Sequence, residues 1–403
     1  MRKFSVPTPF TSGFIEQLAE LNEEFDGSGG RIFEIYGSFQ SGAFHSARPA
    51  KYLPAIDKNQ FRSHVGRGRE KGIRFNYLLN APAYANLEYT SEGRKKLEEL
   101  LSFLVDSGVA SITVAVPYLA EIISRCFPQL EVVVSTIGYV NSLAGIGQYR
   151  DIGVGRIVVD VEVNRDFRFL EKGVAEGRTD LEVIVNPVCI SQCHFKYNHY
   201  CVASTGAQSF LHGGAGAPYN QYYLNWCFLK KLQNGVEILK SPWIRPEDIG
   251  VWQETGISFF KIAGRGLDDT RIVQLCRGYL ERRFSGNLLD LLGWPHWLTF
   301  RENPDGTCLE PLEIMLDNSM LEGFLKFFAE HKPQCRYGCS GCGHCERWAR
   351  RALRYNDRKL LDLYSKNMEE NLSSLVAQIP SGMQTVEAAE KWRRQAGEQR
   401  VDG

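Results

Sequence analysis

No stretch of the 403-residue sequence is apolar for long enough to cross a membrane. A transmembrane helix needs roughly 18 or more consecutive apolar residues, and no window of the sequence approaches that length. The basic start, MRKFSVPTPFTSGF, lacks the apolar run of about 7–15 residues that marks a secretory signal peptide. We therefore expect a cytoplasmic protein that does not associate with a membrane.

The sequence also has no excess of positive or negative charge. The sequence has 47 Lys and Arg against 47 Asp and Glu, and this balance lacks the basic footprint of a nucleic-acid-binding protein. A local basic patch, or an RNA substrate reached through an accessory subunit, is still compatible with it. Hydrophobic residues make up 43% of the chain and aromatic residues 12%, which is enough for a large core.

The sequence also lacks standard motifs of hydrolysis and phosphate binding. It has no His-Glu-x-x-His helix and no Gly-x-Ser-x-Gly elbow. The glycine-rich run STGAQSFLHGGAGAP has no Gly-Lys-Ser/Thr ending, and we interpret it as a flexible lid.

The chain does contain apolar runs of strand length that alternate with segments of helical period. This alternation is typical of a parallel sheet and predicts an α/β fold, a TIM-like (β/α)8 barrel, with an open doubly wound sheet as the alternative. The predicted strands are 3–6, 31–37, 72–79, 110–116, 130–135, 157–161, 181–186 and 257–262.

The alternation ends before the chain does, so we expect two parts. Residues 1–295 form the barrel, and residues 296–403 form a small C-terminal region with a Cys-rich segment at 335–345 and a helical tail. A long excursion, residues 187–245, follows the seventh strand, where a βα loop usually has about 2–6 residues. Such an excess is usually functional or disordered.

Four of the eleven cysteines lie on this excursion: Cys189, Cys193, Cys201 and Cys227. In a reducing compartment, clustered thiols ligate metal more often than they form disulfides. Barrel enzymes build their active sites at the carboxyl ends of the strands, which is where Cys189 and Cys193 follow the seventh strand.

The thiols of the excursion suit a 4Fe-4S cluster, which takes four thiolates. Cys189, Cys193 and Cys227 are the predicted ligands. Zinc is the rival metal, although it prefers paired Cys-x2-Cys knuckles. The fourth ligand is open between Cys201, which is the nearest thiol, His194, His199, Cys308 and an iron without a protein ligand.

A second thiol group, CRYGCSGCGHC, contains Cys335, Cys339, Cys342 and Cys345. Its interspersed glycines would let backbone amides reach the sulfides of a second, auxiliary cluster. Structural zinc is the alternative. The first three cysteines also spell the radical-SAM signature Cys-x3-Cys-x2-Cys, but that motif belongs after the first barrel strand.

Several runs together resemble the collagenase-like peptidase U32 family: FNYLLNAPAYANLEYT, VVVSTIGYVNS, VEVNRDF, VNPVCISQCHF, SPWIRPEDIGVWQETGISFFKIAGR and GNLLDLL. The likeness covers residues 1–295. It implies a barrel that holds a 4Fe-4S cluster through four cysteines. It also implies oxygen-independent hydroxylation of an RNA base or an aromatic ring, with prephenate as a possible oxygen donor. The cysteine spacing and the terminal thiol group differ from the family pattern.

Five other residues are candidate catalytic residues at the barrel mouth. Arg265 follows the eighth strand, and its guanidinium suits bidentate binding of a carboxylate such as prephenate offers. Lys261 needs a carboxylate partner if it is buried, and Glu34 is the expected one. Asn80 and Asn186 complete the set, with loop capping as their alternative role.

These observations predict an iron–sulfur redox enzyme that modifies an RNA base, an aromatic metabolite or a peptide. An electron donor protein or an accessory U32-type subunit is a possible partner. A peptidase, with Cys193 activated by His194 or His199, is the first alternative. A radical-SAM-like enzyme and a non-catalytic maturation partner are the others.

Overall fold

The computed structural model describes residues 1–39, 42–49, 52–205, 222–264, 266–296, 310–335, 338–339 and 341–377. The chain divides into two compact units. The first contains residues 1–219, 235–296 and 314–354, and the second contains residues 220–234, 297–313 and 355–403. No helix of the described residues is both long and apolar enough to span a membrane.

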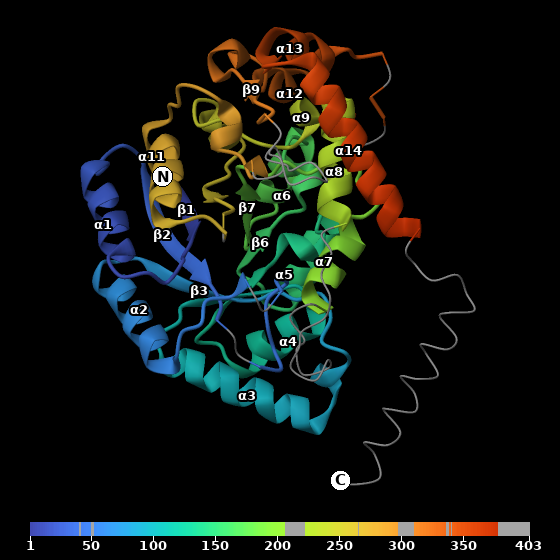
Figure 1. The fold of residues 1–403 in the computed structure, drawn as a ribbon. Coiled ribbons are helices and arrows are strands. Elements are labelled where there is room, and N and C mark those ends of the chain that lie inside the picture. The colour runs from blue at the N-terminus through green and yellow to red at the C-terminus, as the bar shows by residue number, and fades with distance from the viewer. Residues whose placement is uncertain are drawn as a thin grey trace. The chain divides into compact units, whose positions relative to one another are not determined.

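The first unit is built on a closed barrel of eight parallel strands, each hydrogen-bonded to the next in chain order (Figure 1). Strand β1 closes the barrel by pairing with β8, so that Ser5 lies opposite Lys261. All eight predicted strands and the (β/α)8 fold are confirmed. The strands are β1 Arg2–Pro7, β2 Gly30–Gly37, β3 Arg74–Leu79, β4 Ser111–Val114, β5 Glu131–Val134, β6 Arg156–Val158, β7 Asp180–Ile184 and β8 Phe259–Lys261.

Helices surround the strands, because each turns one apolar stripe toward the barrel. In α3, Leu97, Leu101 and Leu104 repeat at helical spacing and are fully buried. The helices of the barrel are α1 Phe14–Glu24, α2 Lys58–Glu70, α3 Ser91–Asp106, α4 Pro117–Cys126, α5 Leu143–Asp151, α6 Phe167–Ala175, α10 Ile249–Glu254 and α11 Asp269–Glu281.

The excursion after β7 contains two further helices of this unit, α7 Lys196–Thr205 and α9 Val236–Lys240. The predicted glycine-rich lid falls mainly on residues 206–221, outside the described residues.

The first unit extends past residue 295 into the C-terminal region. It includes β9 Ile314–Leu316, α12 Lys326–His331 and α13 His344–Ala352, and β9 forms a two-stranded sheet with β10 Leu353–Tyr355. Asn318 fastens this segment to the barrel, because its amide nitrogen donates to the Glu247 carboxylate at 2.9 Å and to the Phe284 carbonyl at 2.7 Å. A separate domain over residues 296–403 stays a prediction.

The second unit contains α8 Tyr222–Gln233 and α14 Arg358–Ala377, which pack against each other. The Tyr364 hydroxyl donates to the Glu310 carbonyl at 3.0 Å, and this bond joins α14 to the part of the second unit that contains residue 310.

Candidate functional site

The first part of the excursion, residues 187–205, is called the β7 loop below. It is bound to residues that follow the carboxyl ends of β5 and β6. The Lys196 ammonium donates to the buried Asp160 carboxylate at 2.6 Å, and the Tyr139 hydroxyl donates to the Lys196 carbonyl at 3.2 Å. The backbone N–H of Gln192 donates to the Glu162 carboxylate at 3.0 Å. These bonds hold the segment that contains Cys189 and Cys193 at the carboxyl-end face of the barrel, where barrel enzymes build their active sites.

Cys189 packs directly on the barrel. It contacts an apolar cluster at the carboxyl ends of the strands, which includes Val158 and Ile184. Cys189 and Cys193 are partly exposed, and Cys201 is exposed. Burial, together with nearby Cys201 and Cys189, raises the pKa of Tyr139. Cys189 and Cys201 therefore both lie near one tyrosine at this face.

The other predicted ligands of the first cluster stay a prediction. Cys227 belongs to the second unit, where Lys231 donates to its sulfur at 2.7 Å. Cys308 lies outside the described residues. Burial lowers the pKa of His199. Within the described part of the chain, no three His, Cys, Asp or Glu side chains are arranged to hold a metal ion.

Glu162 has an unusual environment at the same face. It is half-buried, and its carboxylate accepts hydrogen bonds from the Gln192 backbone and the Ser191 hydroxyl. Burial raises the pKa of Glu162, although the Lys196 ammonium acts in the opposite direction. Its carboxyl group therefore keeps a proton to a higher pH than an exposed glutamate does.

Glu34 lies inside the barrel, where its partner is Arg156. Both side chains are fully buried, and the Arg156 guanidinium donates to the two carboxylate oxygens at 2.9 and 2.8 Å. Ser5, Asn76 and Ser111 also donate to Glu34. Burial alone would raise the pKa of the Glu34 carboxyl, but Arg156 and then Lys261 lower it to about 2.

The expected direct pair between Lys261 and Glu34 is not the one that forms. Lys261 is buried, and its ammonium lies 3.8 Å from the centre of the Tyr36 ring, an arrangement that a cation favours over an aromatic face. Lys261 is near enough to Glu34 to lower the pKa of that carboxyl, but Arg156 makes the hydrogen bonds.

Both predicted asparagines hold backbone segments. The Asn186 carboxamide accepts from the Ala263 N–H at 2.7 Å and donates to the Ala263 carbonyl at 2.8 Å, which ties the end of β7 to the end of β8. Asn80 donates to the Ser135 hydroxyl at 3.1 Å and accepts from the Ala47 N–H at 3.3 Å. The predicted Arg265 lies outside the described residues.

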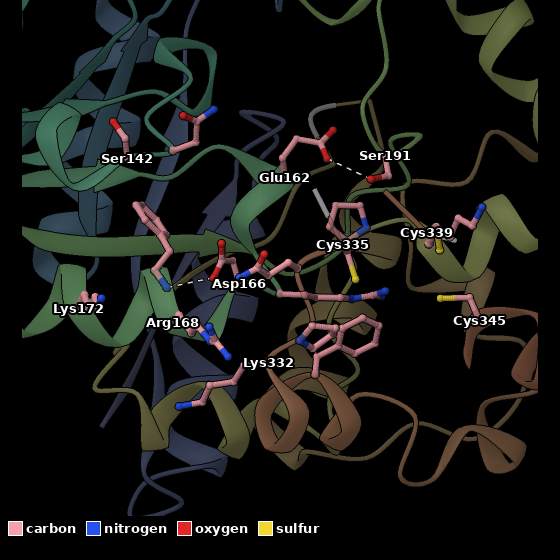
Figure 2. A pocket seen from close by; sticks show the side chains of 18 of the residues that line it. Ser142, Glu162, Asp166, Arg168, Lys172, Ser191, Lys332, Cys335, Cys339 and Cys345 are labelled. Atoms are coloured by element: carbon pink, nitrogen blue, oxygen red, sulfur yellow. Dashed lines mark hydrogen bonds between the residues drawn. The ribbon is translucent and has the colours of Figure 1, made fainter. Parts of the chain in front are cut away.

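A cavity of about 400 Å3 lies beside this face, within the first unit (Figure 2). Ser191, between the two cysteines of the β7 loop, lines it together with Glu162. Cys335, Cys339 and Cys345 line it from the C-terminal segment. In Figure 2 the three cysteines lie on one side of the cavity, and Arg168, Lys172 and Lys332 lie on the other.

Arg165 also lines this cavity, and its side chain is buried. Its guanidinium donates to the carbonyls of Leu239 at 2.8 Å and Trp243 at 2.9 Å, and it packs over the rings of Trp243 and Phe328. Burial lowers the pKa of Arg165 to about 10, while nearby Cys345 and Cys335 oppose that change. The group stays cationic at neutral pH.

The arginine of the barrel interior was missed in the sequence. Arg156 begins the apolar strand RIV, and a charge at the start of such a strand resembles an exposed end residue. One signal was available: Glu34 and Glu182 both lie in the middle of apolar strands, and two buried carboxylates require a cation.

The fold and these loops define a (β/α)8-barrel protein with cysteine-bearing segments beside the carboxyl ends of its strands. Residues 55–283 match the family model described as peptidase family U32, which is more than half of the chain. The chain therefore belongs to peptidase family U32, and the resemblance seen in the sequence is confirmed.

Among its relatives, the chain is 27% identical over 342 residues to an uncharacterized protease of Methanocaldococcus jannaschii, covering 84% of this chain and 93% of the relative. It is similar to the solved U32 peptidase Mk0906, with 17% identity, a TM-score of 0.46 and coverage of 66% of this chain and 93% of that one. It is also similar to a putative copper homeostasis protein CutC of Streptococcus agalactiae, with 13% identity, a TM-score of 0.35 and coverage of 65% and 98%.

Proposed function

We propose that the protein is an iron–sulfur enzyme that hydroxylates, or similarly modifies, its substrate at the carboxyl-end face of the barrel without dioxygen. The observation that carries this proposal is the fastening of the thiol-bearing β7 loop to that face by Lys196, Gln192 and Tyr139. A loop that served only as a connection would not need three thiols held beside the strand ends.

The thiol donors on this segment are of the type that a 4Fe-4S cluster takes. Cys189, Cys193 and Cys201 come from one fastened segment, and all three are at least partly accessible. Cys227, which belongs to the second unit, stays a ligand predicted from the sequence. When bound, the cluster would supply electron transfer and an iron that can coordinate an oxygen-containing ligand.

The residues of the chain have separate roles in this proposal. Lys196 and Asp160 position the loop. Glu162 lines the cavity with a carboxyl group whose pKa is raised by burial, which suits a proton donor in general acid catalysis. Arg265 would bind a carboxylate of the oxygen donor, for which prephenate is our candidate. The substrate class is an RNA base, an aromatic ring or a peptide.

The test is the iron and sulfide content of protein purified without oxygen, together with its activity. We expect Cys189→Ser and Cys193→Ser each to lose about four irons per chain, because a cubane cluster needs its full set of thiolates. Cys126→Ser is the matched control, since this exposed thiol lies on α4. Wild-type protein that is colourless and free of iron would refute the proposal.

A peptidase is the second candidate function, because the relatives carry the names protease and U32 peptidase. It predicts that iron-free protein hydrolyses peptides and that Cys193→Ser abolishes the hydrolysis. The iron–sulfur proposal predicts no hydrolysis by iron-free protein.

A further inference from the structure

The cavity in Figure 2 has more basic than acidic side chains in its lining. The basic ones are Arg165, Arg168, Lys172, Lys240 and Lys332, and the acidic ones are Glu162 and Asp166. Lys240 is paired with Glu237 at 3.0 Å, and Lys332 is paired with Glu171 at 2.6 Å. The three arginine and lysine side chains that remain give the lining a positive charge that these pairs do not offset.

Arg168 and Lys172 form a like-charged pair on α6, which we call the α6 basic pair. The two residues are four positions apart, so they lie on one face of the helix, one turn from each other, and both line the cavity. Like charges at this spacing destabilise a helix. Among the ion pairs of the described residues, none includes Arg168 or Lys172. An anion bound in the cavity would relieve this repulsion.

The two carboxylates of the cavity are bound by donors of the protein itself. Asp166 caps α6, because its carboxylate accepts from the Phe169 N–H at 3.1 Å. Glu162 accepts from the Gln192 N–H at 3.0 Å and from the Ser191 hydroxyl at 3.3 Å. Neither carboxylate forms an ion pair with the α6 basic pair in the part of the chain that the structure describes.

Arg165 adds a buried cation from outside α6. It is only 8% exposed, and its Nε–H has no hydrogen-bond partner among the described residues. The Asp248 carboxylate acts on it electrostatically, but that carboxylate is paired with Arg245 at 2.6 Å. A buried cation without a full counter-charge is costly, so Arg165 also favours an anion in this cavity.

The lining has an apolar part as well. Its members are Leu143, Phe169, Pro242, Phe328 and Pro333. The volume of about 400 Å3 lies in the range of small-molecule sites, which combine apolar walls with a few polar groups that fix the orientation of the ligand. A ligand that fills this space therefore has an apolar body beside its anionic group.

We propose that this cavity binds a phosphate monoester of a small organic molecule, with the phosphate held by Arg168 and Lys172. Such a phosphate carries about 1.5 to 2 negative charges at neutral pH, which matches the two charges of the α6 basic pair, whereas a carboxylate carries one. Arginine binds phosphate through two parallel hydrogen bonds, and lysine binds it as a point charge. A role of this ligand in turnover rests on the proposed function, which places Glu162 in the same cavity, but its binding does not.

Isothermal titration calorimetry of the full-length chain, purified without oxygen, measures the binding of phenyl phosphate. We expect saturable binding of one molecule per chain. Benzoate has the same ring with one negative charge, and inorganic phosphate has no apolar body, so each should bind about tenfold more weakly or worse. Absence of saturable binding of phenyl phosphate, or equally tight binding of benzoate or of inorganic phosphate, would overturn the inference.

Variants of the α6 basic pair locate the site. Arg168→Gln and Lys172→Gln should each weaken the binding of phenyl phosphate about tenfold, because each removes a charged donor to the phosphate. Lys95→Gln is the matched control, since Lys95 is an exposed lysine on α3 and does not line the cavity. All three side chains are exposed, so none of the replacements disturbs the core. Unchanged affinity in both α6 variants, or an equal loss in Lys95→Gln, contradicts the proposed site.

This inference and the proposed function can fail separately. Protein that contains no iron but binds phenyl phosphate through the α6 basic pair would support this inference and refute the proposed function. Protein that contains iron and modifies its substrate but does not bind phenyl phosphate would refute this inference alone.

Discussion

Replacing Arg156 by methionine should destabilise the barrel far more than replacing Glu34 by glutamine. Without Arg156, both Glu34 and Glu182 stay fully buried and lose the cation that pairs with them. Removing one partner of a buried ion pair costs roughly 3–5 kcal/mol, because the remaining charge is uncompensated. Glu34→Gln leaves Arg156 with Glu182 at 3.8 Å and Glu131 at 3.5 Å. Its cost should therefore be smaller, about 1–2 kcal/mol.

Urea denaturation followed by tryptophan fluorescence at pH 7 measures this difference. With a denaturant slope of about 3 kcal/mol per molar urea, Arg156→Met should lower the midpoint by roughly 1 M or more. Arg74→Met is the control, since Arg74 pairs with Glu131 in a more exposed setting and should cost no more than about 1 kcal/mol. If Arg156→Met and Arg74→Met have equal midpoints, the Arg156 pair does not stabilise the barrel as we argue.

Three further predictions concern the same unit. Burial, followed by Arg67, lowers the pKa of His64 to about 4 from 6.5, so wild-type stability should decline as the pH falls from 6.5 to 4. Thermal midpoints should show a flatter decline in His64→Gln, and an identical slope would contradict this assignment. Asn186→Ala should cost about 2–4 kcal/mol in urea denaturation, whereas the exposed Asn59→Ala should be neutral. Lys196→Ala should speed limited proteolysis of the β7 loop several-fold, and an unchanged cleavage rate would show that its bond to Asp160 does not hold the loop.

The strands of the barrel were predictable because their apolar runs are local signals. The run LEVIVN predicts β7, and because Cys189 follows it closely, the sequence alone assigns this thiol to the carboxyl-end face of the barrel. The sequence also indicated the alternative role of Asn186, which is to bind backbone groups, since asparagine commonly does so at strand ends.

The partners of charged residues could not be predicted in the same way. Glu34 and Arg156 are separated by 122 positions and meet only because the barrel closes. Arg165 lies near the C-terminal thiols for a similar reason: Asn318 and α13 return the chain to the barrel after residue 310. Such pairings depend on the tertiary fold, and no local period or spacing encodes them.

The place of Cys335, Cys339 and Cys345 in the cavity wall has a consequence for biosynthesis. A ribosome adds about 5–20 residues per second, so the cysteines near position 190 emerge roughly 8–30 seconds before those near position 340. During that interval the nascent chain exposes Cys189 and Cys193, while the cysteines that line the cavity from the C-terminal segment have not yet been synthesised. If the first thiols bind iron as proposed, iron delivered before translation ends would reach them while this wall of the cavity is still missing.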